Sequence, residues 1–186
     1  MKQSIARCRS VHGVFMDVFS LGVLITGASG AGKSDLALDL ITRGHQLVAD
    51  DSPDMTLTSS DVIDGSCPEV LRDCLRVQDL GVLNVRAMFG DAALKPNQTL
   101  HMIVHLNRNH AAPVQTLPLD PLQGASETLD ILGLKIPQIT LSVSPGRNLA
   151  VLLEAAVRNQ RLKLNGFNAA NEFIQRQRNA MKETSL

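Results

Sequence analysis

The chain has 186 residues, enough for one well-packed domain but too few for two comfortable ones. Its 18 lysine and arginine residues balance 18 aspartate and glutamate residues, so no net field attracts the protein to nucleic acid or to a membrane surface. Five phenylalanines with no tyrosine or tryptophan leave few platforms for stacking bases, which further argues against binding single-stranded nucleic acid.

The first ten residues are polar and basic, and we expect an irregular start there. Residues 1–20 lack the apolar core of a signal peptide, and no stretch approaches the roughly 18 consecutive apolar residues of a membrane span. Cys8, Cys67 and Cys74 are odd in number and lack C-x-x-C spacing, which favours free thiols in a reducing compartment. We therefore expect a cytoplasmic protein with no membrane partner.

Two predicted strands precede a glycine-rich segment. Residues 11–19 alternate apolar and polar side chains over part of their length, and residues 23–26 form a short apolar run with β-branched residues. A turn at residues 20–22 would let the two strands pair, which would carry His12 towards one end of the sheet. Taken alone, His12 is more typical of a structural histidine than of a catalytic one.

A P-loop pattern, G-x-x-x-x-G-K-[ST], follows the second strand at residues 27–34. Leu36, Leu40 and Ile41 are near helical spacing and Gly44 is a C-terminal stop, so the pattern lies between a strand and a helix. This is the context that P-loop chemistry requires, and it makes the match specific.

Glycines in this loop let successive N–H groups point at phosphate oxygens, and the helix that begins near Gly32 adds the positive end of its dipole. Lys33 would reach the β- and γ-phosphates, and the Ser34 hydroxyl would ligate Mg²⁺. The alternative is a glycine-rich turn with a solvated lysine. The expected phosphate cradle consists of Gly27, Ala28, Ser29, Gly30, Ala31, Gly32, Lys33 and Ser34.

A third predicted strand, residues 46–49, ends in Asp50 and Asp51. Adjacent acids at the end of a strand that follows a P-loop helix suit a Mg²⁺ ligand or a base beside the γ-phosphate. The alternative is a solvated acidic turn. Residues 54–64 predict a hairpin that turns at 59–61.

The middle of the chain alternates between regular and irregular segments. Residues 65–79 are mixed and polar, whereas residues 80–89 predict a strand that passes into a turn or short helix. Residues 100–106 alternate, which favours a strand with His101 and His105 on its wetter face. In a helix these two histidines would have zinc-site spacing, but the alternation argues against a metal site.

The last third begins with residues 107–128, which are proline-rich without any period and predict a loop. Residues 136–143 predict a strand, and a turn at 144–147 leads into a helix with an apolar stripe. Arg147 at this junction is a candidate phosphate ligand, or alternatively a solvated arginine at a helix end. Asn168 can cap a final helix.

Three groups of motifs resemble the catalytic domain of HPr kinase/phosphorylase. The first is HGV at residues 12–14 with the P-loop and the RGH…LVADD stretch up to residue 51. The second is LGVLNV from residue 80 with the Phe-Gly pair at 89–90, and the third is PGRNLA from residue 145 with EAA at 154–156. The match runs in order from about residue 5 to 175. The family's usual N-terminal domain is missing, so we expect residues 1–186 to be a form with the catalytic domain only.

This resemblance implies a single α/β domain with a P-loop kinase fold similar to that of phosphoenolpyruvate carboxykinase. It implies a bacterial, hexameric protein kinase that uses ATP and Mg²⁺ to phosphorylate a serine on the phosphocarrier protein HPr of the phosphotransferase system, which regulates carbohydrate metabolism. The same enzyme would reverse the reaction by phosphorolysis, with phosphate and pyrophosphate as partners.

The resemblance also implies residue roles. Asp50 matches the acid that takes the serine proton in one direction and returns one in the other. His12 matches an active-site histidine, Asp51 the second acid and a metal ligand beside Ser34, and Arg147 lies in the loop tied to dephosphorylation.

The sequence departs from the family pattern at four positions, one of which is Ser144, where the family often has a basic residue. Arg76 stands where the family has a glutamate that ligates Mg²⁺, Gln78 stands at an arginine position, and Pro121 lies where an active-site arginine is expected. Losing a metal ligand and a charge-stabilising arginine would each remove transition-state stabilisation. The alternative function is therefore a catalytically weakened nucleotide-sensing protein of the same fold. A small-molecule kinase on the same P-loop is a third, weaker option.

Overall fold

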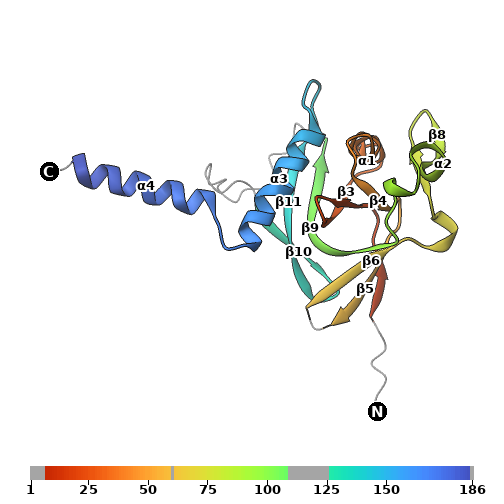
Figure 1. Ribbon diagram of the computed structural model, residues 1–186, viewed down its shortest axis with the longest axis horizontal. Helices are drawn as coiled ribbons and strands as arrows, with labels where there is room; N and C mark the ends of the chain where they lie inside the picture. The colour runs from red at the N-terminus through yellow and green to blue at the C-terminus, as the bar shows by residue number, and fades with distance from the viewer. Residues whose placement is uncertain (1–6, 60, 109–125, 185–186) are drawn as a thin grey trace, which may run out of the picture.

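A curled, mixed β-sheet runs through the computed structural model, which describes residues 7–59, 61–108 and 126–184 (Figure 1). At its centre β9 lies parallel to both β3 and β11. β2 pairs antiparallel with β3 and with β4, so β4 runs in the direction of β3. The strands of this sheet are β1 (Cys8–Ser10), β2 (Val14–Val18), β3 (Leu21–Gly27), β4 (Gln46–Ala49), β5 (Asp54–Ser59), β6 (Val62–Ser66), β9 (Asn97–Asn107), β10 (Ser126–Ile131) and β11 (Leu134–Ser142).

A separate two-stranded hairpin lies beside the sheet and leads into a short helix. Its strands are antiparallel, and the Asn84 side chain caps the helix that follows by accepting a hydrogen bond from the N–H of Ala87 at 2.8 Å. Two 3₁₀ turns flank the unit, η1 (Glu69–Leu71) and η2 (Asp91–Ala93). The hairpin and helix are β7 (Cys74–Val77), β8 (Gly81–Asn84) and α2 (Val85–Phe89).

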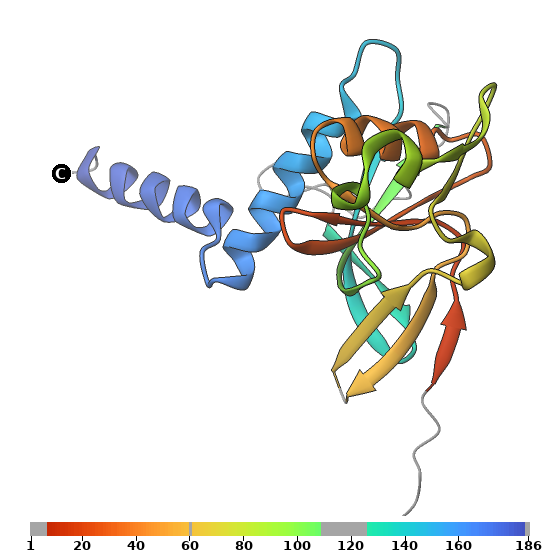
Figure 2. The ribbon, with the colours of Figure 1, turned by 45° about the vertical axis from the view of Figure 1, so that its right-hand side comes forward.

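Three longer helices complete the structure: α1 (Lys33–Thr42), α3 (Leu149–Leu164) and α4 (Ala169–Thr184). α1 and α3 cover one face of the sheet, whereas α4 extends away from the body of the domain in both views (Figures 1 and 2). Asn148 caps α3 and Asn168 accepts hydrogen bonds from the first turn of α4. Within the described residues, no helix is both long and apolar enough to cross a membrane.

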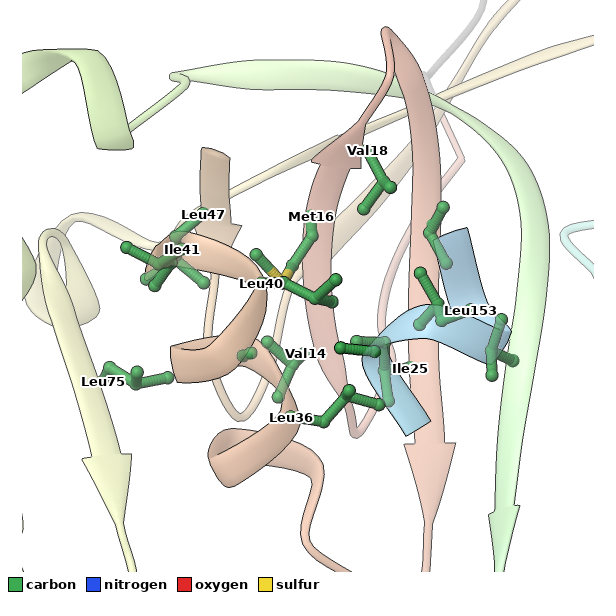
Figure 3. Close-up of a cluster of buried hydrophobic side chains, with 14 of the residues drawn as sticks. Val14, Met16, Val18, Ile25, Leu36, Leu40, Ile41, Leu47, Leu75 and Leu153 are labelled. Carbon is green, nitrogen blue, oxygen red and sulfur yellow. The ribbon is translucent and has the colours of Figure 1, made fainter. Parts of the chain in front are cut away.

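Both faces of the sheet are buried, because side chains along β2 alternate between two hydrophobic cores. Val14, Met16 and Val18 point into the core under α1 and α3 (Figure 3). Phe15 belongs to the second core, on the opposite face. Burying each large side chain of this kind contributes roughly 2 kcal/mol relative to leaving it exposed. The elements around the sheet edge are thus held against a rigid, two-sided core.

This topology brings the candidate residues to one edge of the sheet. β3, β4, β9 and β11 share one direction, so their carboxyl ends lie at the same edge. Residues 27–34, Asp50–Asp51, Arg108 and Arg147 follow those four ends. β2 runs the opposite way, so His12, just before it, lies at the same edge.

The structure confirms a single α/β domain and most predicted elements, including the strand at residues 46–49, the hairpin across residues 54–64 and a capped last helix. It corrects three predictions. Residues 8–10 of the expected irregular start pair with β5, and the polar segment 65–79 contains β7. Residues 126–128 of the predicted loop belong to β10, and residues 109–125 lie outside the described residues. All three corrected strands pair through their backbones with a neighbouring strand, and none has an apolar run long enough to predict it from the sequence.

Candidate active site

The glycine-rich loop at residues 27–32 joins β3 to α1 and lines a cavity of about 710 Å³. Gly30 and Gly32 have φ angles of +74° and +90°, the left-handed region that favours glycine. A Cβ at Gly27 would lie 2.7 Å from the carbonyl oxygen of Leu106 on β9, so packing dictates that glycine. The loop can therefore present its backbone N–H groups to an anion.

Lys33 folds back over this loop. Its Nζ donates hydrogen bonds to the carbonyl oxygens of Gly27 and Ala28 at 3.0 and 3.1 Å. The ammonium group is thereby held at the mouth of the loop, where a phosphate bound to the N–H groups would meet it.

Asp50 is the buried acid of the cavity, with only 6% of its surface exposed. Its Oδ2 accepts a hydrogen bond from the main-chain N–H of Arg76 at 2.7 Å, and its Oδ1 accepts a longer one from Ser34 Oγ at 3.4 Å. Burial raises the pKa of Asp50 above its usual value, against the opposing effect of hydrogen bonds from Arg76, Asp51 and Ser34. A carboxylate with raised basicity is suited to accepting a proton.

Asp51 and His12 form the exposed side of the cavity. Asp51 has a φ of +71°, which aspartate tolerates better than most residues, and its carbonyl oxygen accepts a hydrogen bond from Gly13 at 3.0 Å. The Asp51 Oδ1 lies 3.3 Å from His12 Nδ1, and both side chains are at least half exposed. The turn after β4 thus points Asp50 inwards and Asp51 outwards.

The β7–β8 hairpin forms a wall of the same cavity as the glycine loop, as the family resemblance at residues 76 and 78 implies. Leu75 and Val77 are buried in the core, so Arg76 between them points to the other side of the strand, and Gln78 lies in the turn after it. Gln78 Oε1 lies 3.9 Å from where a Cβ of Gly30 would be, which places this side of the strand over the loop. Besides that resemblance, the alternation of Leu75 and Val77 is the local sequence signal for this wall.

Arg147 does not line this cavity. It lines a second one of about 500 Å³ on the other side of the start of α1, and its Nη1 lies 3.4 Å from the carbonyl oxygen of Ser142. Arg108, which the sequence analysis missed, lines the same second cavity, with its Nη1 3.6 Å from where a Cβ of Gly30 would be. Its position directly after β9, the neighbour of β3, was the signal that could have found it.

The oxygen donors of the main cavity suit a magnesium ion only when phosphate oxygens complete the shell. The described residues contain no cluster of three or more His, Cys, Asp or Glu side chains that could hold a metal alone. Ser34 Oγ and the two adjacent carboxylates are hard oxygen ligands, and Mg²⁺ commonly binds one or two such groups together with substrate phosphates. His101 and His105 each bond to β3 instead, to the Gly22 N–H and to Thr26 Oγ1, both at 3.0 Å. All three cysteines are free, as predicted.

Comparisons with known proteins agree on one family. Residues 3–177 match the profile of the HPr serine kinase C-terminal domain. HPr kinase/phosphorylases of Xylella fastidiosa and Xanthomonas campestris are each 53% identical over 173 residues, which is 93% of this chain but 54% of theirs. The chain thus spans about half the length of these relatives. A solved structure of the Hpr(Ser) kinase/phosphatase from Coxiella burnetii superimposes with a TM-score of 0.76 at 38% identity, covering 89% of this chain and 98% of that one.

Proposed function

The chain belongs to the HPr serine kinase C-terminal domain family, and from this membership we propose that it is a protein-serine kinase and phosphorylase acting on the phosphocarrier protein HPr. Residues 3–177 would form the catalytic unit, with ATP and Mg²⁺ as phosphate donor and metal. The glycine-rich loop would be a P-loop, in a fold akin to phosphoenolpyruvate carboxykinase. The observation that carries the proposal is Asp50, a buried carboxylate of raised pKa that faces Ser34 in the loop's cavity.

In the kinase direction the serine hydroxyl of HPr would enter beside Asp50. Asp50 accepts the hydroxyl proton as the serine oxygen forms a bond to the γ-phosphorus, and the bond from that phosphorus to the β-phosphate oxygen breaks, which releases ADP. Burial favours this step because it makes Asp50 a stronger base than a solvated aspartate. Only 6% of Asp50 is exposed, so bulk water has little access to the proton it gains.

The phosphorolysis direction uses the same groups in reverse. An oxygen of inorganic phosphate attacks the phosphorus of phosphoserine, pyrophosphate forms, and protonated Asp50 returns a proton to the departing serine oxygen. The proton of the attacking phosphate then restores the Asp50 carboxylic acid, so the cycle balances. A raised pKa assists this direction also, because it increases the protonated fraction of Asp50.

The remaining residues would bind and orient. Lys33 and the loop N–H groups hold the β- and γ-phosphates, and Ser34 with Asp51 would hold Mg²⁺, which when bound screens the phosphate charge. His12 would orient Asp51 across their 3.3 Å contact. Arg147 lies across α1 from Asp50, so its proposed part in dephosphorylation requires that it act from the second cavity or on another copy of the chain in the proposed hexamer.

The direct test is transfer of the labelled γ-phosphate of ATP to purified HPr, followed by addition of inorganic phosphate. We expect label on one serine of HPr and its later release as pyrophosphate. Lys33→Met, which removes the phosphate clamp, is the negative control. Absence of label from HPr with the unaltered chain, under conditions in which nucleotide binds, contradicts the proposal.

One observation favours a second candidate function. Arg76, an arginine at a position where a metal ligand is expected from the family resemblance, lines the same cavity as Ser34 and Asp50. A cation there could leave nucleotide binding intact while removing transfer, which would make the protein a nucleotide sensor. Nucleotide binding that depends on Lys33, without transfer to HPr in either direction, identifies the sensor.

A further inference from the structure

We propose that Arg76 is a catalytic residue whose guanidinium binds the phosphoryl group that moves between nucleotide and serine. The proposal rests on the kinase function above. The Arg76 guanidinium would supply part of the positive charge that a metal ion otherwise supplies. Phosphate binding should therefore persist without a divalent cation.

The direction of the Arg76 side chain follows from its strand. Leu75 is fully buried and Val77 is 4% exposed, both in the core beneath α1, so Arg76, which lies between them on β7, occupies the opposite face. In the turn after β7, Gln78 Oε1 lies 3.9 Å from where a Cβ of Gly30 would be. Arg76, Gln78 and the glycine loop therefore line one cavity.

The main chain fixes where along the cavity Arg76 stands. Its N–H donates to Asp50 Oδ2 at 2.7 Å, and the same carboxylate contacts Ser34 Oγ through its other oxygen. Arg76 therefore begins one hydrogen bond away from the proposed base and lines the same cavity as Lys33, whose Nζ donates to the loop carbonyls. A phosphoryl group moving between the loop and the base would pass through the cavity that both cations line.

The Arg76 guanidinium has no ion-pair partner within the part of the chain that the structure describes. Among the described residues no carboxylate forms an ion pair with Arg76, although Asp35, Asp50 and Asp51 line the same cavity. Arg43 and Arg86, by contrast, are each paired with acids. A planar guanidinium matches two phosphate oxygens at once, and charge placed on the equatorial oxygens of a transferring phosphoryl group stabilises its transition state.

The test separates the guanidinium from the backbone contact, because side-chain substitutions keep the N–H that holds Asp50. The variants are Arg76→Gln, Arg76→Lys and Arg76→Glu. Arg72→Gln is the matched control, since Arg72 lies just before the same hairpin but lines a different cavity. Thermal unfolding of each variant checks that the fold is retained.

The first measurement is calorimetric binding of inorganic pyrophosphate and of ATP in EDTA. We expect the unaltered chain and Arg72→Gln to bind both, and Arg76→Gln to bind about tenfold or more weakly. The loss should be partial for Arg76→Lys and greatest for Arg76→Glu. Equal pyrophosphate affinity for the unaltered chain and Arg76→Gln overturns the proposal.

The second measurement is single-turnover transfer to HPr with saturating ATP and Mg²⁺. At saturating ATP, where weaker nucleotide binding does not limit the rate, Arg76→Gln should slow transfer about 100-fold. A rise in transfer and in Mg²⁺ dependence for Arg76→Glu overturns the proposal, because the position then lacks a metal ligand rather than supplying a cation. If the unaltered chain does not transfer phosphate at all, the kinase function fails, and the binding measurement in EDTA still decides the role of Arg76.

Discussion

Two aspartates in this protein have the same exposure and opposite surroundings. Asp17 on β2 and Asp50 after β4 are each 6% exposed. Asp17 accepts hydrogen bonds from the ammonium of Lys95, the amide of Gln98 and, at 2.8 Å, the main-chain N–H of Ser20. Every hydrogen bond that Asp50 accepts comes from a neutral donor.

The difference shows that partners, rather than depth, decide what a buried acid does. A carboxylate removed from water is costly unless a cation compensates it, and Lys95 does so for Asp17. Asp50 has hydrogen bonds but no such cation among the described residues, and so keeps a high proton affinity. One acid closes the end of a β-hairpin, and the other is available for chemistry.

The largest expected effect is the loss of phosphate transfer when Asp50 is replaced. Asp50→Asn keeps the shape of the side chain but cannot accept the serine proton, so transfer to HPr should fall about 10³-fold or more. Nucleotide affinity should stay within a few-fold, because the proposed phosphate-binding groups are Lys33 and the loop rather than Asp50. Single-turnover transfer and nucleotide titration measure the two effects. Turnover like that of the unaltered chain would remove Asp50 from the role of base.

Asp17→Asn should produce the opposite pattern. It leaves the partly buried ammonium of Lys95 without its anion, and the protein should lose roughly 2 kcal/mol of unfolding free energy. Transfer per folded molecule should be unchanged, since Asp17 lies at the far end of β2 from His12. Urea unfolding at pH 7 with an activity assay below the transition checks both. Surface substitutions typically change the unfolding free energy by no more than about 0.5 kcal/mol. A change that small in Asp17→Asn would show that Lys95 does not stabilise the Asp17 carboxylate, and that the two aspartates differ less than their partners indicate.

The contrast between these two acids could not be read from the sequence, although their positions could. The end of the strand at residues 46–49 and its acidic pair follow from local pattern, and β2 follows from its alternation. The partner of Asp17 is 78 residues away and reaches it only because η2 and β9 return to the hairpin. No local period encodes such a contact.

The same limit applies around the candidate site. The glycine loop and the helix after it are short-range features, and their order was predictable. Arg76 and Gln78 became part of the cavity because β7, a short strand without a neighbour in the main sheet, packs Leu75 and Val77 onto α1. Arg147 was predicted as a candidate phosphate ligand, but it lines the second cavity rather than the one that contains Asp50.

A smaller effect, the dependence of the unfolding free energy on pH, also distinguishes Asp50 from Asp17. Burial raises the pKa of Asp50 in the fold above that of the unfolded chain, so between these two values the native state binds more protons. The unfolding free energy should therefore fall as pH rises through the folded pKa, by about 1.4 kcal/mol for each tenfold increase in proton affinity. Urea unfolding of the unaltered chain and of Asp50→Asn across acidic to neutral pH isolates this slope. The slope should be missing from the variant, and transfer in the unaltered chain should decline as pH falls through the same range.

The smallest expected effect concerns Asp51, a third acid that has a partner but little burial. Its contact with His12 is half exposed at both ends, and such pairs contribute about 0–1 kcal/mol, so His12→Ala should leave the unfolding free energy nearly unchanged. Transfer should fall only a few-fold to about tenfold, because Asp51 loses its orienting contact while Asp50 keeps its own hydrogen bonds. The check is transfer by His12→Ala, by Asp51→Asn and by the double variant, in which the two effects should not add. A loss in His12→Ala as large as that in Asp50→Asn would make the exposed histidine the proton acceptor. Burial with neutral partners would then no longer distinguish the reactive acid from Asp17.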